Sequence, residues 1–487
     1  MKLELAKNTI YLILMTCLIV FSSSVQGKPV IESSIAVNSY ISHGAIDVDG
    51  NTQFKSTATA EGWDLSGTRD GSSFAPFVIS GYNITLTGTS LIKIHNTDLY
   101  FEIQGNILNG QLFSGIGIDF SNTSNVVIAD NIIQGYSNAG IYSEASSNYL
   151  IINNTIMNTG YGIHFSSVNG VNVTQNDISH SSNYGIFVYG GNSDTYTFNT
   201  VTDSDSGGIS LSSSSQNLVY ENTVSVGGDG ISVNNGHLNV IKNNHLSGLT
   251  YTGVHIQYTS NQNEVVNNTI TAITHYGILI EGTSNTLDLG NNIHNNTIMS
   301  VENGMYIRYA NLTLIYYNLF DNMTKDGILF QQAYNSTIQF NIIKNADALA
   351  IDFDDASYYN SVFRNQFIDN NAQGSSQASD KGPGNVFQYN YWNDWTSPDV
   401  NNDGVVDVPY QISTSAVNQA DPFPIVSPDN MNVIAQPLPS TSSSGSTTTR
   451  SSTTASQNSS NTTTPYPIFG LFFGWIAIIM ILKKKKY

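Results

Sequence analysis

The sequence predicts an all-β protein built around a parallel β-helix, a solenoid of about 13 coils. Two repeating features predict this fold. An asparagine recurs every 22 to 28 residues, and a block of Gly-apolar-x-apolar recurs with nearly the same step. No segment between residues 80 and 390 shows a sustained helical period. A step in this range is typical of solenoid repeats. The asparagine series is Asn106, Asn131, Asn154, Asn176, Asn199, Asn222, Asn244, Asn268, Asn296, Asn318, Asn341, Asn365 and Asn390.

Each repeat divides into three short strands. In the coil that contains Asn154, apolar residues alternate within Tyr161–Phe165 and Asn169–Val173, and Gly or Asn bounds each run. Strands this short cannot bury a face alone, so they must stack coil on coil into three parallel sheets around a narrow core. Because connections between parallel strands are overwhelmingly right-handed, we expect a right-handed β-helix.

The recurring asparagine and glycine have structural explanations. Stacked Asn side chains can bond to one another and to the turn backbone, whose polar groups would otherwise be buried unpaired. The glycine permits a tight bend where a side chain would clash. We therefore exclude the asparagine series from the functional candidates.

The two ends of the chain differ from its middle. Lys2 and Lys7 precede an apolar stretch typical of a secretory signal, although an uncleaved anchor has the same pattern. A second apolar segment before four terminal lysines predicts a membrane helix with a cytoplasmic C-terminus, and a cleaved sorting tail is the alternative. The predicted organisation is a signal peptide (1–27), an N-terminal cap region (28–80), the β-helix repeats (81–390), a C-terminal cap (391–428), a Ser/Thr-rich stalk (429–464), a transmembrane helix (465–482) and a cytoplasmic lysine tail (483–487).

The composition predicts an extracellular protein at the cell surface. Charged residues make up 11% of the chain, well below the usual value of roughly 25%. The one cysteine, Cys17, lies in the predicted signal, so we expect no disulfide. Sequons in the repeats and the stalk make the chain a candidate glycoprotein. Excluding the terminal segments removes six of the 17 basic residues but one of the 36 acidic residues, which leaves about 24 net negative charges. This balance disfavours nucleic acid as a partner and favours cations.

A loop after the repeats has the spacing of a calcium-binding loop. Side-chain oxygens occupy positions 1, 3, 5 and 9, Gly404 occupies position 6, and the carbonyl at position 7 adds an oxygen. Tyr410 at position 12 cannot supply a bidentate carboxylate. The predicted Ca²⁺ ligands, which would stabilise the C-terminal cap, are Asp399, Asn401, Asp403, Val405 and Asp407. An Asx-rich turn that binds nothing is the alternative.

The coils resemble the NosD-like family of parallel β-helix repeats and the wider carbohydrate-binding and sugar-hydrolase β-helices. The segments Asn390–Trp395, Val408–Tyr410 and Asp421–Pro424, together with the Asp/Asn-Gly loop, are similar to the end of NosD-like surface proteins, which are abundant in archaea. The resemblance covers about residues 80–428 and implies the fold and an archaeal-type surface protein. The family name is linked to copper delivery, which would need clustered imidazole or soft ligands. The nine histidines are scattered, so we expect no copper.

Residues beside the inward apolar positions should form outward columns along the solenoid. One predicted column runs from Asp119 to Asp352, and its neighbour runs from Ser121 to Asp354. Aromatic side chains on consecutive coils of these columns suit stacking against sugar rings, although aromatic residues are also good strand formers. The predicted glycan-binding residues are Tyr142, His164, Phe187 and Tyr189.

Further along the same face lies a set of polar residues with catalytic potential. It comprises His255, Glu281, Tyr306, Arg308, Asp352, Asp354 and Asp355. Polysaccharide lyases, epimerases and glycosidases of this fold use a base, an acid and a cation, or paired carboxylates. The Gly-His-Gly and Arg-x-Lys motifs of pectin hydrolases and the Asp-Pro-His-Asp motif of alginate epimerases are absent. The longest repeat interval, between Asn268 and Asn296, predicts a protruding loop beside this set.

The sequence therefore predicts a membrane-tethered extracellular β-helix that binds cell-surface glycans or surface proteins without catalysing a reaction. A polysaccharide lyase or hydrolase is one alternative, and a purely structural stalk or envelope component is another.

Overall fold

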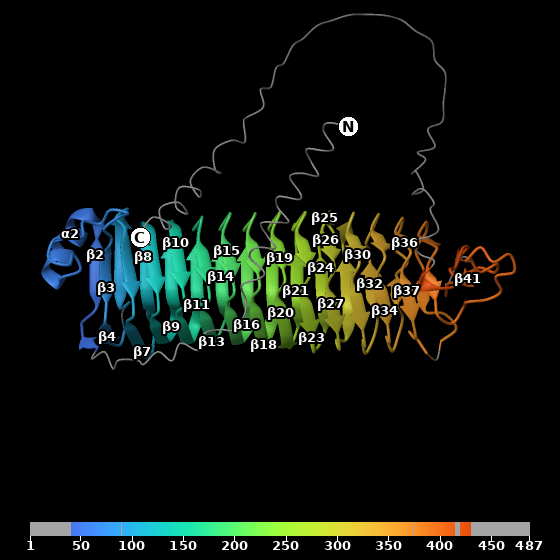
Figure 1. Ribbon diagram of the computed structural model, residues 1–487, viewed down its shortest axis with the longest axis horizontal. Helices are drawn as coiled ribbons and strands as arrows, with labels where there is room; N and C mark the ends of the chain where they lie inside the picture. Colours follow the sequence, from blue (N-terminus) through green and yellow to red (C-terminus); the bar gives the residue numbers. More distant parts are fainter. Residues whose placement is uncertain (1–39, 89, 373, 414–418, 430–487) are drawn as a thin grey trace, which may run out of the picture. The chain divides into compact units, whose positions relative to one another are not determined.

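The computed structural model describes residues 40–429 except 89, 373 and 414–418. The described chain winds into about 14 coils that stack as three parallel sheets (Figure 1). Several long strands bend from one sheet into the next, and one helix, α2 (Gly50–Glu61), interrupts the first coil. The predicted architecture is confirmed.

From the third coil onward, the strand of sheet 1 directly follows the asparagine of its coil. The first residues of four long strands belong to this sheet: β9 (Ile132–Glu144), β11 (Thr155–Ser166), β16 (Thr200–Ser212) and β18 (Thr223–Asn234). Its other strands are β1 (Ile41–Ser42), β4 (Tyr82–Thr85), β7 (Ile107–Phe113), β13 (Asp177–Ser181), β20 (His245–Leu249), β23 (Thr269–Thr271), β27 (Thr297–Met299), β31 (Leu319–Asp321), β34 (Ile342–Lys344), β37 (Gln366–Ile368) and β40 (Tyr391–Trp392).

Sheet 2 carries the glycine blocks. It contains β2 (Ile46–Asp49), β5 (Ile92–Thr97), the start of β8 (Ile116–Ala129), the ends of β9, β11, β16 and β18, and β14 (Tyr184–Tyr189), β21 (Thr252–Gln257), β24 (Tyr276–Glu281), β28 (Asn303–Arg308), β32 (Ile328–Gln331), β35 (Ile351–Phe353) and β38 (Ala378–Asp380).

Sheet 3 completes each coil. It contains β3 (Phe77–Ser80), β6 (Phe101–Gln104), the end of β8, and β10 (Ser147–Ile152), β12 (Asn172–Thr174), β15 (Thr195–Thr197), β17 (Leu218–Tyr220), β19 (Val240–Lys242), β22 (Glu264–Val266), β26 (Asn292–His294), β30 (Leu314–Tyr316), β33 (Thr337–Gln339), β36 (Ser361–Phe363) and β39 (Val386–Gln388). Two small pairs lie outside the three sheets: β25 (Asp288–Leu289) with β29 (Ala310–Asn311), and β41 (Tyr410–Gln411) with β42 (Ala420–Asp421).

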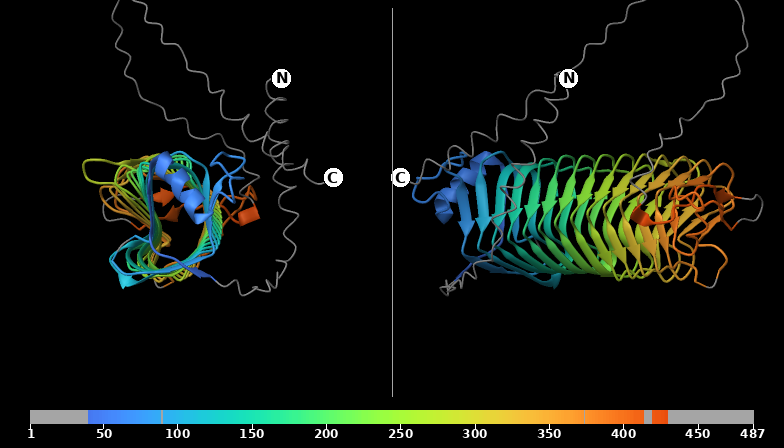
Figure 2. Two further views of the ribbon diagram at one scale, coloured as in Figure 1. Left: turned by 90° about the vertical axis from the view of Figure 1, so that its left-hand side faces the viewer. Right: turned by 45° about the vertical axis from the view of Figure 1, so that its right-hand side comes forward.

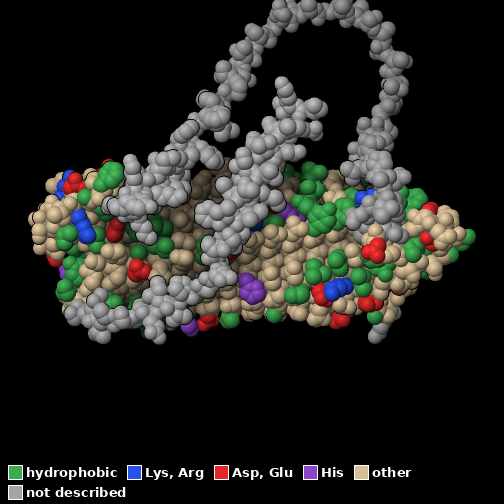
Figure 3. All heavy atoms as spheres, in the orientation of Figure 1, with side chains coloured by type: hydrophobic (Ala, Val, Ile, Leu, Met, Phe, Trp, Pro, Cys, Tyr) green, Lys and Arg blue, Asp and Glu red, His purple; other side chains and the backbone are tan. Residues whose placement is uncertain are grey.

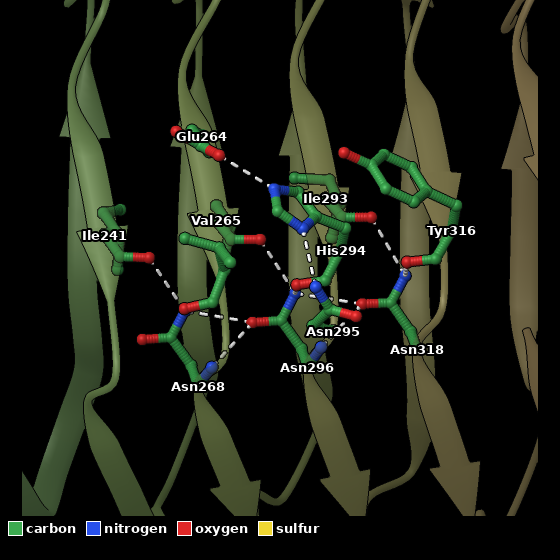
Figure 4. A network of polar contacts seen from close by, with 11 residues as sticks. Ile241, Glu264, Val265, Asn268, Ile293, His294, Asn295, Asn296, Tyr316 and Asn318 are labelled. Atoms are coloured by element: carbon green, nitrogen blue, oxygen red, sulfur yellow. Dashed lines mark hydrogen bonds and ion pairs between the residues drawn. The ribbon is translucent and has the colours of Figure 1, made fainter. Parts of the chain in front are cut away.

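The asparagine series forms the predicted inward ladder. The side chain of Asn154 is 1% exposed, and its Nδ2 donates to Asn176 Oδ1 at 3.0 Å and to the carbonyl of Ile128 at 2.9 Å. Figure 4 shows the same pattern where Asn296 meets Asn318. The ladder ends when Asn390 donates to the buried carboxylate of Asp421 at 3.0 Å. Each coil thus satisfies backbone groups that would otherwise be buried without partners.

A second polar ladder, which the sequence did not lead us to predict, lies at the corner between sheets 2 and 3. Asn217 Nδ2 donates to Asn239 Oδ1 at 3.1 Å, and later members repeat the contact. At one end, burial raises the pKa of Asp194 to about 6. The ladder is less uniform than the first, because Asp, Thr or Ser replaces Asn at several coils. Its buried members are Asp194, Asn217, Asn239, Asn263, Asn291, Thr313, Ser336, Asn360 and Asn385.

The repeated glycines are required by close packing and not by a tight bend, which corrects our prediction. Gly162 lies within a strand, and its φ is outside the left-handed region. A Cβ at this position would lie 2.4 Å from Ile178 Cγ2 and 2.5 Å from the carbonyl oxygen of Gly185. A side chain here would therefore force the core of the neighbouring coil apart.

Both ends of the stack are covered. Strands β1 to β3 pair with β4 to β6, so the stack begins within the region for which the sequence predicts a cap. Helix α2 lies across the open end (Figure 2) and buries Phe54 against Phe77 and Phe101. At the other end, Trp392 is buried and stacks on Tyr410 with ring centroids 4.0 Å apart. Such covers keep the edge of a parallel stack from pairing with another chain.

The predicted signal peptide, the stalk beyond residue 429, the membrane helix and the lysine tail lie outside the described residues. Among the residues that the structure describes, no helix has the length and apolar character needed to cross a membrane.

Candidate functional site

The outer face of sheet 2 carries both predicted columns in the predicted register. Tyr142 pairs with His164, and His164 pairs with Phe187 in the next coil. In the neighbouring column, Gln257 pairs with Glu281, which pairs with Arg308. The sheet therefore lines up the glycan-binding and catalytic candidates along one face, with the aromatic ones nearer the N-terminal end.

Five rings from three consecutive coils contact one another on this face, and we name this set the aromatic platform. Its members are Tyr142, Tyr161, His164, Tyr184 and Phe187. The ring centroid of His164 lies 5.2 Å from those of both Tyr142 and Phe187. Burial lowers the pKa of His164, so this ring is neutral at neutral pH, and its Nδ1 is buried without a hydrogen-bond partner. Tyr189 lies in the neighbouring column and is 51% exposed.

A buried polar pair follows the platform toward the C-terminus. The Nδ1 of His255 lies 3.2 Å from Oδ2 of Asp229, which belongs to the preceding coil. The His255 side chain is 7% exposed, and its Nε2 is buried without a hydrogen-bond partner. Between the platform and this pair, the column carries the small side chains of Ser210 and Ser232, whose hydroxyl oxygens are 2.9 Å apart.

The other catalytic candidates share the face but are engaged by neighbouring groups. Arg308 Nη1 lies 3.1 Å from Glu281 Oε1, so this pair is an ion pair at a half-exposed site, which contributes under about 1 kcal/mol. The Tyr306 hydroxyl donates to Gln331, and burial raises the pKa of Tyr306 to about 12. The extra residues of the longest interval follow Glu281 as an exposed turn, as the spacing predicts.

The three aspartates of the catalytic set have different surroundings. Asp352 Oδ1 lies 3.5 Å from Lys381 Nζ. Asp354 Oδ1 accepts hydrogen bonds from the backbone N–H of Gln332 at 3.1 Å and from the Ser357 hydroxyl at 2.6 Å, which assigns it to a turn. Asp355 is exposed in that turn. These three described aspartates thus form no pair of free carboxylates on either side of a cleft.

In the predicted calcium loop, side-chain carboxylates accept hydrogen bonds from the backbone of the same loop. Asp399 accepts from the backbone N–H of Asp403 and of Gly404, and Asp407 Oδ2 accepts from that of Val400 at 2.7 Å. Gly404 has φ +86°, the left-handed conformation that position 6 of such a loop requires. Oxygen donors of this kind fit Ca²⁺. Within the described residues, no three His, Cys, Asp or Glu side chains converge into a metal-binding group.

Histidines suitable for copper are likewise dispersed over the described part of the chain. Six of them pair singly with a carboxylate, as His294 does with Glu264 at 2.8 Å (Figure 4). Copper sites need several imidazole or sulfur ligands around one point. The described residues do not fit such a site.

A polar hollow of about 310 Å³ lies near the N-terminal end, at the corner after sheet 2. Asn122 and Asn96, which line it, bond to each other at 3.0 Å, and Asn51 bonds to Asp98 at 2.7 Å. Since these amides satisfy one another, we assign the hollow no ligand.

Sequence reasoning missed Tyr161, Tyr184 and Asp229. Each stands directly before the glycine of a repeat block, and the register aligns Tyr184 with Gly207 and Gly207 with Asp229. A third outward column at this position was thus readable from the repeat, but we considered only the two columns that follow the glycine.

Comparison with known proteins places the chain in a family. The model of the right-handed β-helix region matches residues 3–196 and 139–293, and that of the periplasmic copper-binding protein NosD matches residues 221–411. The chain belongs to the right-handed β-helix family, which agrees with the predicted handedness, and its residues 221–411 are similar to NosD. No curated protein sequence matches the chain.

Solved structures share the fold at low sequence identity. The A-module of the mannuronan C-5 epimerase AlgE4 of Azotobacter vinelandii is 14% identical, with a TM-score of 0.47 over 72% of this chain and 97% of that one. The tailspike protein of Escherichia coli bacteriophage HK620, solved with a hexasaccharide, is 11% identical, with a TM-score of 0.43 over 71% of each chain. These similarities concern the fold alone.

Proposed function

We propose that this protein binds glycans outside the cell through the outer face of sheet 2, and that it does so without catalysing a reaction. The aromatic platform is the observation that carries the proposal. Five rings, joined by contacts between neighbouring rings, stand on an outward face, where a solenoid needs no such cluster for its core. Aromatic rings provide apolar area for the C–H faces of sugar rings at little cost in side-chain entropy.

The chemistry of the surrounding surface supports a polar, uncharged ligand. On the face that Figure 3 shows, backbone and side chains that are neither apolar nor charged cover most of the described surface, and charged side chains are scattered over it. Beyond the platform the column continues with Ser210 and Ser232, and the neighbouring column with Ser212 and Asn234. Such groups donate and accept hydrogen bonds, as sugar hydroxyls do.

A polysaccharide lyase or hydrolase receives less support from the geometry. Glu281 and Arg308 neutralise each other, and Asp354 serves a turn. A purely structural stalk is the other alternative, and it would leave the platform without a ligand. Attachment to the membrane through residues 465–482 belongs to the same proposal and rests on the sequence.

A panel of immobilised glycans, probed with the ectodomain of residues 28–435, tests the proposal. We expect binding to a subset of glycans, and Phe187→Ala should weaken it about tenfold, which corresponds to ~1.4 kcal/mol. Tyr359→Ala is the matched control, because Tyr359 is 63% exposed but lies at another corner. Binding to no glycan, or equal losses for both variants, would contradict the proposal. Cleavage of uronate polymers, followed by absorbance and reducing-end assays, would favour the enzyme instead.

Calcium in the C-terminal cap is a separate proposal that rests on the donor set of the loop. Asp399, Asp403 and Asp407 supply carboxylate oxygens within nine residues, and bound Ca²⁺ would hold the loop against Tyr410 and Trp395. Chelation should lower the melting temperature of the wild-type ectodomain and leave an Asp399→Ala variant unchanged. Equal melting temperatures of the wild type with and without chelator would reject calcium.

A further inference from the structure

The Asp229–His255 pair combines three features that a core histidine does not need. It lies on the outer face of sheet 2, in the columns that carry the platform. Both partners are largely shielded, with side-chain exposures of 14% for Asp229 and 7% for His255. One polar atom of each, Oδ1 of Asp229 and Nε2 of His255, is buried without a hydrogen-bond partner. Unpaired buried polar atoms are costly, and native proteins retain few of them.

The pair defines which ring nitrogen of His255 is available. An ionised carboxylate can only accept, so the contact at 3.2 Å requires the imidazole hydrogen to be on Nδ1. In the neutral ring Nε2 is then a hydrogen-bond acceptor. A sugar hydroxyl is a donor that fits it.

The side chains around the pair connect it to the platform. The ring of Tyr184 lies over Gly207, where an added Cβ would be 3.2 Å from Tyr184 Cε1, and Gly207 aligns with Asp229 in the next coil. Burial, together with the charge of Asp229, raises the pKa of Tyr184. On the other side, the ring of Tyr251 packs edge-on against His255 with centroids 6.0 Å apart and is 42% exposed. For a ligand to reach the buried Nε2, an exposed neighbouring ring such as that of Tyr251 would have to change its rotamer.

The charged groups near the pair favour neutral sugars over acidic ones. Asp229 is an acid, and the cations that follow on this side, Arg308 and Lys325, are each paired with a carboxylate, Glu281 and Glu302. A uronate would meet uncompensated repulsion at Asp229. A neutral sugar would not.

We infer that Asp229 and His255 form a polar subsite, next to the aromatic platform, in which His255 Nε2 accepts a hydrogen bond from a hydroxyl of a neutral glycan. Asp229 is a positioning residue, since it orients the imidazole and sets its tautomer. This inference rests on the proposed function and names its ligand class.

The test uses the full chain with ¹⁵N-labelled histidine and, as probes, neutral glucose, mannose and galactose hexamers beside oligogalacturonate. We expect a neutral hexamer to bind and to shift the Nε2 resonance of His255, and oligogalacturonate to bind more weakly. His255→Ala should weaken binding about tenfold. His180→Ala is the matched control, because His180 forms a comparable pair with Asp203, 3.4 Å away, on an exposed site elsewhere.

The outcomes separate the two proposals. If Phe187→Ala weakens binding but His255→Ala does not, the subsite is rejected and the platform stands. A Nε2 resonance that stays constant at saturation also rejects the subsite, and this reading needs no variant to fold. Stronger binding of oligogalacturonate rejects the neutral class. Absence of binding to these four probes by a wild-type chain that binds another glycan of the panel rejects the subsite alone, and absence of binding to the whole panel rejects both proposals.

Discussion

The asparagine ladder and the outer face of sheet 2 belong to the same repeat. They differ in whether equivalent positions of successive coils carry the same residue type. In the ladder, Asn154, Asn222 and Asn341 lie in different coils, and each donates the same side-chain hydrogen bond to the asparagine of the next coil. Outside, successive coils present Tyr142, His164, Phe187 and then Ser210 at one position. The side chains of the asparagine ladder have hydrogen-bond partners, whereas the outer face retains unpaired buried atoms such as His255 Nε2. The difference indicates that the ladder specifies the fold, and it is the reason why we propose the outer face as the binding surface.

Removal of one ladder amide should give the largest effect on stability. Asn222→Ala removes the acceptor for two N–H groups of Asn199 and the donor to the carbonyl of Tyr196. We expect a loss of ~3 kcal/mol in the free energy of unfolding, measured by denaturant titration. Thr223→Ala, at the exposed next residue, should change it by less than about 0.5 kcal/mol. Similar losses for both variants would mean that the ladder is not special.

A glycine of the repeat should be the next most sensitive site. Gly162→Ala places a methyl group against Ile178 and Gly185, and we expect a loss of ~2 kcal/mol from overpacking. Gly44→Ala is the control, since nothing lies within 4 Å of the added atom. A neutral Gly162→Ala variant would show that the coils can separate locally at little cost.

A buried acid beside the outer face should make stability depend on pH. Burial raises the pKa of Asp288 to about 8. The folded chain therefore holds a proton that the unfolded chain releases near pH 4, so this contribution to stability falls as pH rises from about 4 to 8. Asp288→Asn keeps an acceptor for the N–H of Ser260. Its melting temperature relative to the wild type should rise across that window, and a constant difference would contradict the assignment.

The coil step and the two-residue strand period made the first ladder, the core and two outward columns predictable. Each depends on a residue type that recurs at a fixed position. The second ladder was not predicted from the sequence because Asp194, Thr313 and Ser336 interrupt its series of asparagines. Helix α2 was not predicted because its sequence has no marked apolar face. The helix is stabilised by packing of Phe54 and Ala58 under the first coil.

The candidate site was predictable only in part. The neighbours of Tyr142, His164 and Phe187 follow from register, and the structure brings these rings together. Asp229 could not be assigned to His255 from spacing alone, because the pairing is diagonal, between different columns of adjacent coils. Such contacts depend on side-chain rotamers, which a repeat pattern does not specify.

The binding of a glycan to the outer face of sheet 2 can be measured by hydroxyl-radical footprinting of the tyrosines with and without the glycan. We expect protection of Tyr142, Tyr161 and Tyr184 on the outer face of sheet 2, and unchanged labelling of Tyr317 and Tyr359, which are exposed elsewhere. Protection of Tyr317 or Tyr359 with no change at the platform would contradict it.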